Sequence, residues 1–180
     1  MKSFVLSTIL MASAFVQAQP KFQEIETSNG YTYLLGEIET SQLESESYSS
    51  WFSVNYKAYA VDHALIPLVE PALKKHDILL FLGTWCGDSK REVPRILKIL
   101  DAAKFPKNQL KIIALDRRKE NYKKGLNGEE EGWDIKRVPT LILLKDGVEV
   151  NRIVERPIDS LEEDLLAILS QANYIPNYAN

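Results

Sequence analysis

The only cysteine of this 180-residue chain, Cys86, is the side chain best suited to chemistry. It follows a short apolar run, Ile78 to Leu82, which predicts a strand buried on both faces and broken by Gly83. Beyond Cys86, apolar residues recur at i, i+3, i+4 and i+7, the spacing of an amphipathic helix. We therefore expect Cys86 at a turn from a strand into the first turn of a helix.

This position favours reactivity at the sulfur. The first turn of a helix carries unpaired N–H groups and a partial positive charge, and both stabilise a thiolate relative to a thiol. A thiolate is the nucleophile of thiol–disulfide exchange. The competing interpretation is a free cysteine packed as a small apolar residue. A lone cysteine in an exported chain indicates a reactive thiol or intermolecular pairing.

The residues around the cysteine resemble the active-site loop of the thioredoxin superfamily. A tryptophan precedes the nucleophile, a glycine follows it and a lysine closes the turn, in the stretch Trp85-Cys86-Gly87-Asp88-Ser89-Lys90. Ser89 stands where the family usually has a second cysteine. Pro94 stands where proline kinks the family's active-site helix.

A second stretch, 133–150, resembles the later signature of the same superfamily. Val138-Pro139-Thr140 matches its cis-proline loop, and a strand and a Lys-Asp-Gly hairpin turn follow. The resemblance covers Tyr48 to Gln171. It implies a thioredoxin-like α/β fold with a mixed central sheet, and the alternation of predicted strands and helices also favours a sheet with helices on both faces.

The resemblance implies roles for eight residues. Cys86 is the expected nucleophile, and Ser89 is expected to assist it by donating a hydrogen bond to the thiolate. The expected substrate-binding residues come from the two motifs: Trp85, Gly87, Asp88, Val138, Pro139 and Thr140. In the family, backbone groups beside the cis-proline pair with an extended peptide around the target cysteine.

Two departures from the family pattern bear on turnover. Asp88 replaces the usual proline, and its carboxylate would repel a nearby thiolate, although Lys90 and Arg91 offset this charge. Leu80 replaces the family's buried carboxylate, which assists proton removal from the second cysteine. Because Ser89 cannot form a disulfide, release of a mixed disulfide needs an external thiol or the substrate's own second cysteine.

The leading hypothesis is therefore an exported protein that performs thiol–disulfide exchange through one cysteine, as a monothiol reductase or isomerase. The alternative is a catalytically impaired binding module that holds client peptides at the Pro139 loop. Peroxide reduction through Cys86 is less favoured, because the expected Thr and Arg pattern is absent.

The N-terminal residues predict export. Lys2 precedes a 13-residue apolar run that is short for a membrane span of about 20 residues, and Val16-Gln17-Ala18 resembles a cleavage site. We expect a signal peptide over 1–18, an N-terminal extension with a possible first strand over 19–47 and the thioredoxin-like domain over 48–180. Export implies a periplasmic or secreted protein with no membrane segment after cleavage.

Later segments give local predictions. Asp116 to Glu131 is highly charged and predicts a short exposed helix with a loop. Asp146-Gly147 between two apolar runs predicts a hairpin. Ser160, followed by Glu163, predicts the start of a closing amphipathic helix.

The composition and net charge limit the classes of binding partner that we expect for this chain. With 45% hydrophobic and 26% charged residues and a net charge of −3, the chain is typical of globular proteins, and its charge argues against nucleic-acid binding. His63 and His76 lack partners at metal-ligand spacing, so no metal site is expected. We expect no cofactor, although an external thiol such as glutathione would serve as co-substrate. The expected partners are client proteins or low-molecular-weight thiols, joined as mixed disulfides.

Overall fold

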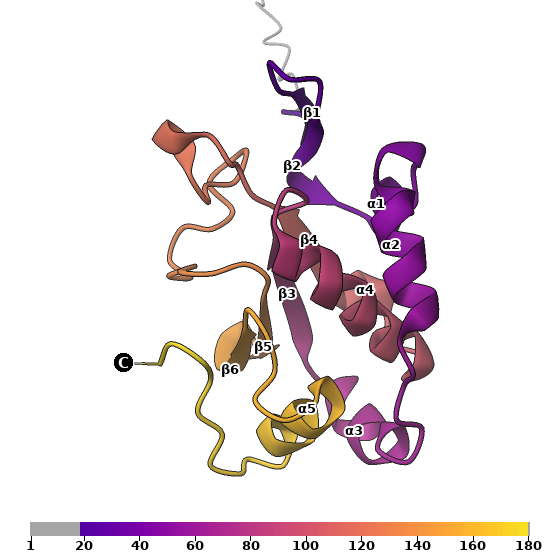
Figure 1. The fold of residues 1–180 in the computed structure, drawn as a ribbon. Coiled ribbons are helices and arrows are strands. Elements are labelled where there is room, and N and C mark those ends of the chain that lie inside the picture. Colours follow the sequence, from indigo (N-terminus) through magenta and orange to yellow (C-terminus); the bar gives the residue numbers. More distant parts are fainter. Residues whose placement is uncertain (1–18, 180) are drawn as a thin grey trace, which may run out of the picture.

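A computed structural model describes residues 19–179 of the chain as a six-stranded mixed sheet with helices (Figure 1). The strand order is β1-β2-β4-β3-β5-β6, and β3 pairs in parallel with β4 and antiparallel with β5. The other pairs are antiparallel. The strands are β1 (Phe22–Glu26), β2 (Thr32–Ile38), β3 (Asp77–Leu82), β4 (Leu110–Ala114), β5 (Thr140–Lys145) and β6 (Val148–Val154).

Every described α-helix contributes buried apolar side chains to one large core on one face of the sheet. Residues at alternate positions of β3, such as Ile78, Leu80 and Leu82, point into this core and are fully buried. Helices α2 and α4 pack together across the upper part of this face, and α3 and α5 lie below them (Figure 1). The helices are α1 (Thr40–Leu43), α2 (Glu46–Ala58), α3 (Ile66–Leu73), α4 (Gly87–Ala102) and α5 (Leu161–Leu169).

The opposite face of the sheet carries a smaller core without a helix among the described residues. Leu79 and Phe81 of β3 point into it, and Trp133 and Ile135 of the β4–β5 connection pack against it. A groove of about 520 Å³ remains open beside Leu79, with Ile113 in its lining. The prediction of helices on both faces is therefore wrong for this face, while the mixed thioredoxin-like sheet is confirmed.

The β4–β5 connection, 115–139, contains only a short 3-10 helix, η2 (Lys119–Asn121), where a short helix was predicted. This segment runs over the helix-free side of the sheet (Figure 1). Residues 116–131 of this segment carry many charges and two glycines, so they offer no apolar stripe that a helix would bury. A further 3-10 helix, η1 (Lys107–Gln109), precedes β4.

The segment 19–47 contains a hairpin and a short helix. β1 pairs with β2 around Asn29-Gly30, and β2 joins the central sheet through β4. The predicted signal peptide, 1–18, lies outside the described residues. Within the described part, no helix is long and apolar enough to cross a bilayer.

Two local predictions are confirmed. Asp146 and Gly147 both have positive φ, 52° and 79°, as a tight primed hairpin turn between β5 and β6 requires. The Glu163 N–H donates to Ser160 Oγ at 3.1 Å, so Ser160 caps α5.

Candidate active site

Cys86 lies in the turn between β3, which ends at Leu82, and α4, which begins at Gly87. Its backbone is extended, with φ −91° and ψ 131°, and it occupies the N-cap position of the 16-residue helix α4. Its N–H donates to Gly83 O at 2.8 Å, which holds the turn, and its side chain is only partly buried. Cys86, a partly exposed residue, thus lies at the positive end of a helix, which is the position that the sequence predicted.

The loop 138–140 lies against that sulfur. Cys86 Sγ is 3.3 Å from Val138 O, in hydrogen-bonding geometry, although the two residues are 52 positions apart in the sequence. The Val138–Pro139 peptide bond is cis. Thr140 is buried, and its hydroxyl donates to Arg137 O at 2.8 Å, so it fixes the loop internally.

Ser89 lies one turn into α4 and is fully buried. Its Oγ accepts the Gly83 N–H at 3.1 Å, which ties the first turn of α4 to the end of β3. This geometry makes Ser89 a positioning residue for the turn that carries the sulfur. A hydrogen bond from Ser89 to the thiolate stays a prediction.

Asp88 and Gly87 form the exposed start of α4. The Asp88 carboxylate accepts a hydrogen bond from Arg91 Nη2 at 2.7 Å, and Arg91 Nε also contacts the buried carboxylate of Glu92 at 2.6 Å. The charge of Asp88 is therefore partly neutralised by Arg91, as the sequence predicted for the flanking cations. Gly87 is exposed and has open space around its Cα.

Trp85 forms a partly buried wall beside the cysteine. Its indole N–H donates to Leu115 O at 2.8 Å, which joins the active-site turn to the segment that leaves β4. A Cβ at position 83 would lie 2.6 Å from the Trp85 ring, so only glycine there lets the ring pack over the strand end. Gly83 therefore helps to position Trp85 as well as ending β3.

A buried carboxylate anchors the start of the β4–β5 connection. Asp116 accepts a hydrogen bond from the Tyr33 hydroxyl at 2.7 Å and bonds from the backbone and guanidinium of Arg118. Burial alone would raise the pKa of Asp116, but these bonds outweigh burial and hold that pKa below its usual range. Burial and the neighbouring Asp116 raise the pKa of Tyr33 to about 12.

The structure adds three residues that sequence reasoning left out of the site. The Tyr122 ring packs on Trp85 with centroids 5.5 Å apart, Lys123 lies over the Tyr122 ring, and Arg137 immediately precedes the Val138 loop. Tyr122 and Lys123 belong to a stretch that was interpreted as an exposed helix and loop. The one local signal was a lone aromatic residue within a charged run.

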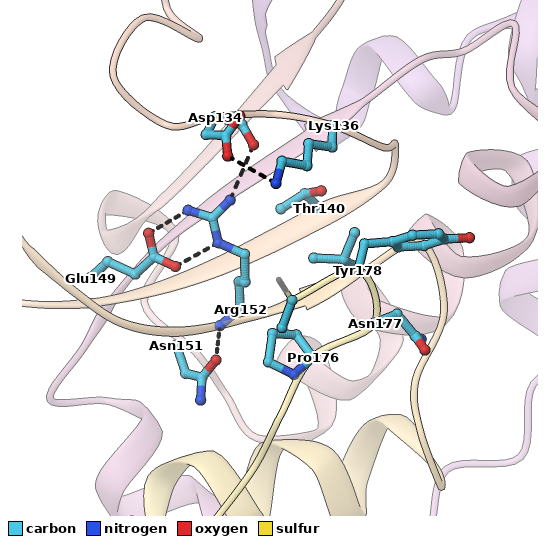
Figure 2. A pocket seen from close by; sticks show the side chains of 11 residues that line it. Asp134, Lys136, Thr140, Glu149, Asn151, Arg152, Pro176, Asn177 and Tyr178 are labelled. Atoms are coloured by element: carbon cyan, nitrogen blue, oxygen red, sulfur yellow. Dashed lines mark hydrogen bonds and ion pairs between the residues drawn. The ribbon is translucent and has the colours of Figure 1, made fainter.

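A separate pocket of about 370 Å³ lies between β6, the segment before β5 and the C-terminal tail (Figure 2). Arg152 is at its centre, where it contacts Glu149 at 2.6 Å and donates to Trp133 O at 2.9 Å. Among the predicted site residues that the structure describes, only Thr140 lines this pocket. The charge of Arg152 is thus already matched by a carboxylate of the protein itself.

Within residues 19–179, no three His, Cys, Asp or Glu side chains gather as a metal site would require.

Comparisons with known proteins point in one direction. A thioredoxin family model matches residues 39–166. A thioredoxin H-type protein of Picea mariana is 28% identical over 92 residues, which make up 51% of this chain and 66% of that protein. The chain thus spans just under two thirds of the length of that relative.

Two solved structures share the fold. A protein of unknown function from Pseudomonas aeruginosa superposes with a TM-score of 0.50 at 12% identity, covering 71% of this chain and 86% of that one. An HIV epitope-scaffold superposes with a TM-score of 0.50 at 14% identity, covering 71% and 87%. The family match, which covers most of the chain and includes both the Cys86 turn and the cis-proline loop, shows that the chain belongs to the thioredoxin family.

Proposed function

We propose that this protein performs thiol–disulfide exchange through Cys86 alone, as a monothiol reductase or isomerase. The observation that carries this proposal is the position of Cys86, a partly exposed residue at the N-cap of α4 whose sulfur contacts Val138 O beside the cis-proline. Family membership supports a function of the thiol–disulfide oxidoreductase type in general.

The proposed reaction begins when the Cys86 thiolate attacks one sulfur of a substrate disulfide. A new bond forms between Cys86 Sγ and that sulfur while the substrate S–S bond breaks, and the departing sulfur leaves as a thiolate with the bonding electron pair. Cys86 is thereby oxidised to a mixed disulfide and the departing sulfur is reduced. The unpaired N–H groups of the first turn of α4 favour the starting thiolate.

Release of the substrate from the mixed disulfide needs a second thiol, and this chain has no second cysteine to supply it. Ser89, which occupies the place of that cysteine, is buried against Gly83 N and carries no sulfur. A second thiol must therefore attack the Cys86–substrate bond. We propose that this thiol is either a low-molecular-weight thiol, such as glutathione, or the second cysteine of the client protein.

The direct test is to mix the reduced protein with bis(2-hydroxyethyl) disulfide, a small neutral disulfide, and to follow adduct formation on Cys86 by intact-protein mass spectrometry. We expect one adduct per chain, reversed by added glutathione, and none on the Cys86→Ser variant. Failure of folded, reduced protein to form the adduct faster than an unstructured cysteine peptide would overturn the proposal.

A Ser89→Cys variant tests the proposed reason for single-cysteine behaviour. The new thiol sits one helical turn from Cys86, so it should attack the mixed disulfide and release the bound substrate thiol without any external reductant. The expected readout is a transient adduct that gives way to an internal disulfide, against a lasting adduct in the wild type. Lasting adducts in both proteins would contradict the proposed geometry of resolution.

A second candidate function, a binding module, is favoured by the absence of a resolving cysteine in the chain. In this case the loop around Pro139 holds an extended client peptide, and exchange at Cys86 is incidental. The two functions differ in the Cys86→Ala variant. The client is an unfolded protein that carries a disulfide, so that Cys86 has an S–S bond to attack. Capture that persists in this variant supports the binding module, whereas capture that depends on the sulfur supports exchange.

We also propose that the protein is exported, to the periplasm or the exterior, on the strength of the sequence pattern over 1–18. Expression of the full chain in a secreting host, followed by N-terminal sequencing, tests this. We expect a mature chain that begins at Gln19 outside the cytoplasm, and an uncleaved chain retained in the cytoplasm contradicts it.

A further inference from the structure

Lys123 is a cation held close to the cysteine by the β4–β5 connection. Its ammonium lies 5.0 Å from the centroid of the Tyr122 ring, and that ring packs against Trp85, the neighbour of Cys86. The same ammonium donates a hydrogen bond to the carbonyl of Lys136. Lys123 is therefore fixed between the Trp85 wall and the chain that enters the cis-proline loop.

Arg137 is the second cation beside the site. It directly precedes Val138, whose carbonyl contacts the Cys86 sulfur at 3.3 Å. Its guanidinium lies 4.9 Å from the centroid of the Tyr178 ring, and the residue is exposed. Stacking on the ring leaves the edge of the guanidinium, with its N–H donors, free to meet an acceptor.

Neither cation forms an ion pair with a carboxylate of the described residues, although other charges of this region are paired. Arg91 pairs with Asp88, and Lys136 pairs with Asp134. Glu155, the acidic group that acts on Lys123, already accepts the Tyr178 hydroxyl. Within the described part of this acidic chain, whose net charge is −3, two cations near the only thiol thus lack an ion-pair partner.

The pKa of Lys123 reflects its closeness to Cys86 and Arg137. Burial lowers the pKa of Lys123, and the charge of Arg137 lowers it further, while Cys86 and Glu155 raise it. Lys123 therefore lies within electrostatic reach of both Arg137 and Cys86, even though the three residues come from separate segments.

We propose that Lys123 and Arg137 form a carboxylate-binding pair that selects disulfides carrying a carboxylate close to the sulfur that Cys86 attacks. This inference rests on the proposed exchange at Cys86 and adds the class of substrate. Arginine binds carboxylate oxygens through paired N–H donors, and lysine adds a compact point charge. The pair places an anionic group beside Val138 while the substrate sulfur approaches Cys86.

Two sources supply this chemistry: a small thiol with its own carboxylates, and a protein segment with Asp or Glu beside its cysteine. Both share the negative charge near sulfur that the cation pair recognises. The cation pair would recognise this negative charge from either source, and separate arms of the experiment distinguish the small thiol from the protein segment.

The experiment compares three small disulfides of similar size and different charge: 3,3′-dithiodipropionate, bis(2-hydroxyethyl) disulfide and cystamine. The second-order rate of adduct formation on Cys86 is measured for each and divided by the rate for an unstructured cysteine peptide. We expect the normalised rate to be highest for the anionic disulfide and lowest for the cationic one. The preference should shrink as ionic strength rises from about 10 mM to about 0.5 M, because salt screens partly exposed charges.

Matched variants assign the preference to residues. Lys123→Gln and Arg137→Gln should each lower the ratio of the rate with the anionic disulfide to the rate with the neutral disulfide by roughly two- to five-fold, the usual size of a partly exposed charge pair. Lys124→Gln removes the same charge from an exposed residue next to Lys123 and serves as the control. An equal fall of this ratio in Lys124→Gln, or an equal slowing of the neutral disulfide, would overturn the assignment.

The remaining outcomes separate this inference from the proposed function. Equal normalised rates for all three disulfides in the wild type overturn the cation pair and leave exchange at Cys86 intact, whereas no reaction with any of them overturns exchange itself. In further arms, oxidised glutathione and a peptide disulfide flanked by Glu are compared with an otherwise identical peptide flanked by Gln. Faster reaction of either anionic probe supports the pair and names the source of the carboxylate.

Discussion

The two faces of the sheet are built differently. One face is covered by five helices over a large buried core, while the other has a small core covered by the β4–β5 connection and an open groove. Cys86, Trp85 and Val138 all belong to the smaller core or pack against it. Segments with few buried apolar contacts open most easily, so we expect the face that carries Cys86 to have a lower local stability than the helical face.

The largest expected difference concerns two neighbouring leucines of β3. Leu80 is fully buried under the helices, whereas Leu79 faces the open groove. We expect Leu80→Ala to lower the free energy of unfolding by about 3 to 5 kcal/mol, because it leaves a closed cavity, and Leu79→Ala by only about 1 to 2 kcal/mol. Urea unfolding of both variants measures the difference, and equal losses would contradict the contrast between the faces.

A substitution at Asp116 tests how the β4–β5 connection is anchored to the face with the smaller core. Asp116→Asn should cost about 2 kcal/mol at neutral pH, since the buried carboxylate accepts bonds from Tyr33 and Arg118. The folded-state pKa of Asp116 is lowered, so its contribution is present above the unfolded value of about 4 and is lost as pH falls below it.

The measurement for Asp116 is the free energy of unfolding at pH 7 and at pH 3, with the exposed Asp77→Asn as control. The difference between wild type and Asp116→Asn should narrow at the lower pH. A difference that stays constant would show that the carboxylate charge does not hold this segment.

Trp85→Phe probes the connection between the active-site turn and the loop. The change keeps a ring but removes the N–H that donates to Leu115 O, which should cost about 1 kcal/mol. Hydrogen exchange should rise in residues 116–137 while α2 and α4 stay protected. Trp51→Phe, which alters the helical face, should leave hydrogen exchange in residues 116–137 unchanged. Faster exchange in that loop in Trp51→Phe but not in Trp85→Phe would contradict the role of Trp85.

Ser160→Ala gives the smallest expected effect and confines it to the helical face. Loss of the cap bond to the Glu163 N–H should lower the free energy of unfolding by about 0.5 to 1 kcal/mol. The rate of Cys86 alkylation should stay at the wild-type value, because α5 does not contact the sulfur. A changed alkylation rate would mean that the two faces are coupled more strongly than their separate cores suggest.

Local patterns predicted much of the fold. The apolar run before Gly83, the helical spacing after Cys86, the Asp146-Gly147 turn and the Ser160 cap all rest on contacts between residues close in sequence, and the structure contains each of them. The covering of the second face was predicted wrongly, because the charged segment 116–131 has no apolar stripe for a helix and instead follows the anchor at Asp116.

The sequence by itself determined where the sulfur lies, since a strand, a glycine and a helix start within a few residues of one another fix Cys86 at an N-cap. Only the tertiary structure decided what surrounds that sulfur. Val138 contacts it, and Lys123 and Arg137 come near it, through sheet pairing and loop packing across long sequence separations, which no local pattern encodes. The proposed reactivity of Cys86 thus rests on local sequence, whereas the proposed recognition of a substrate's charge rests on the fold.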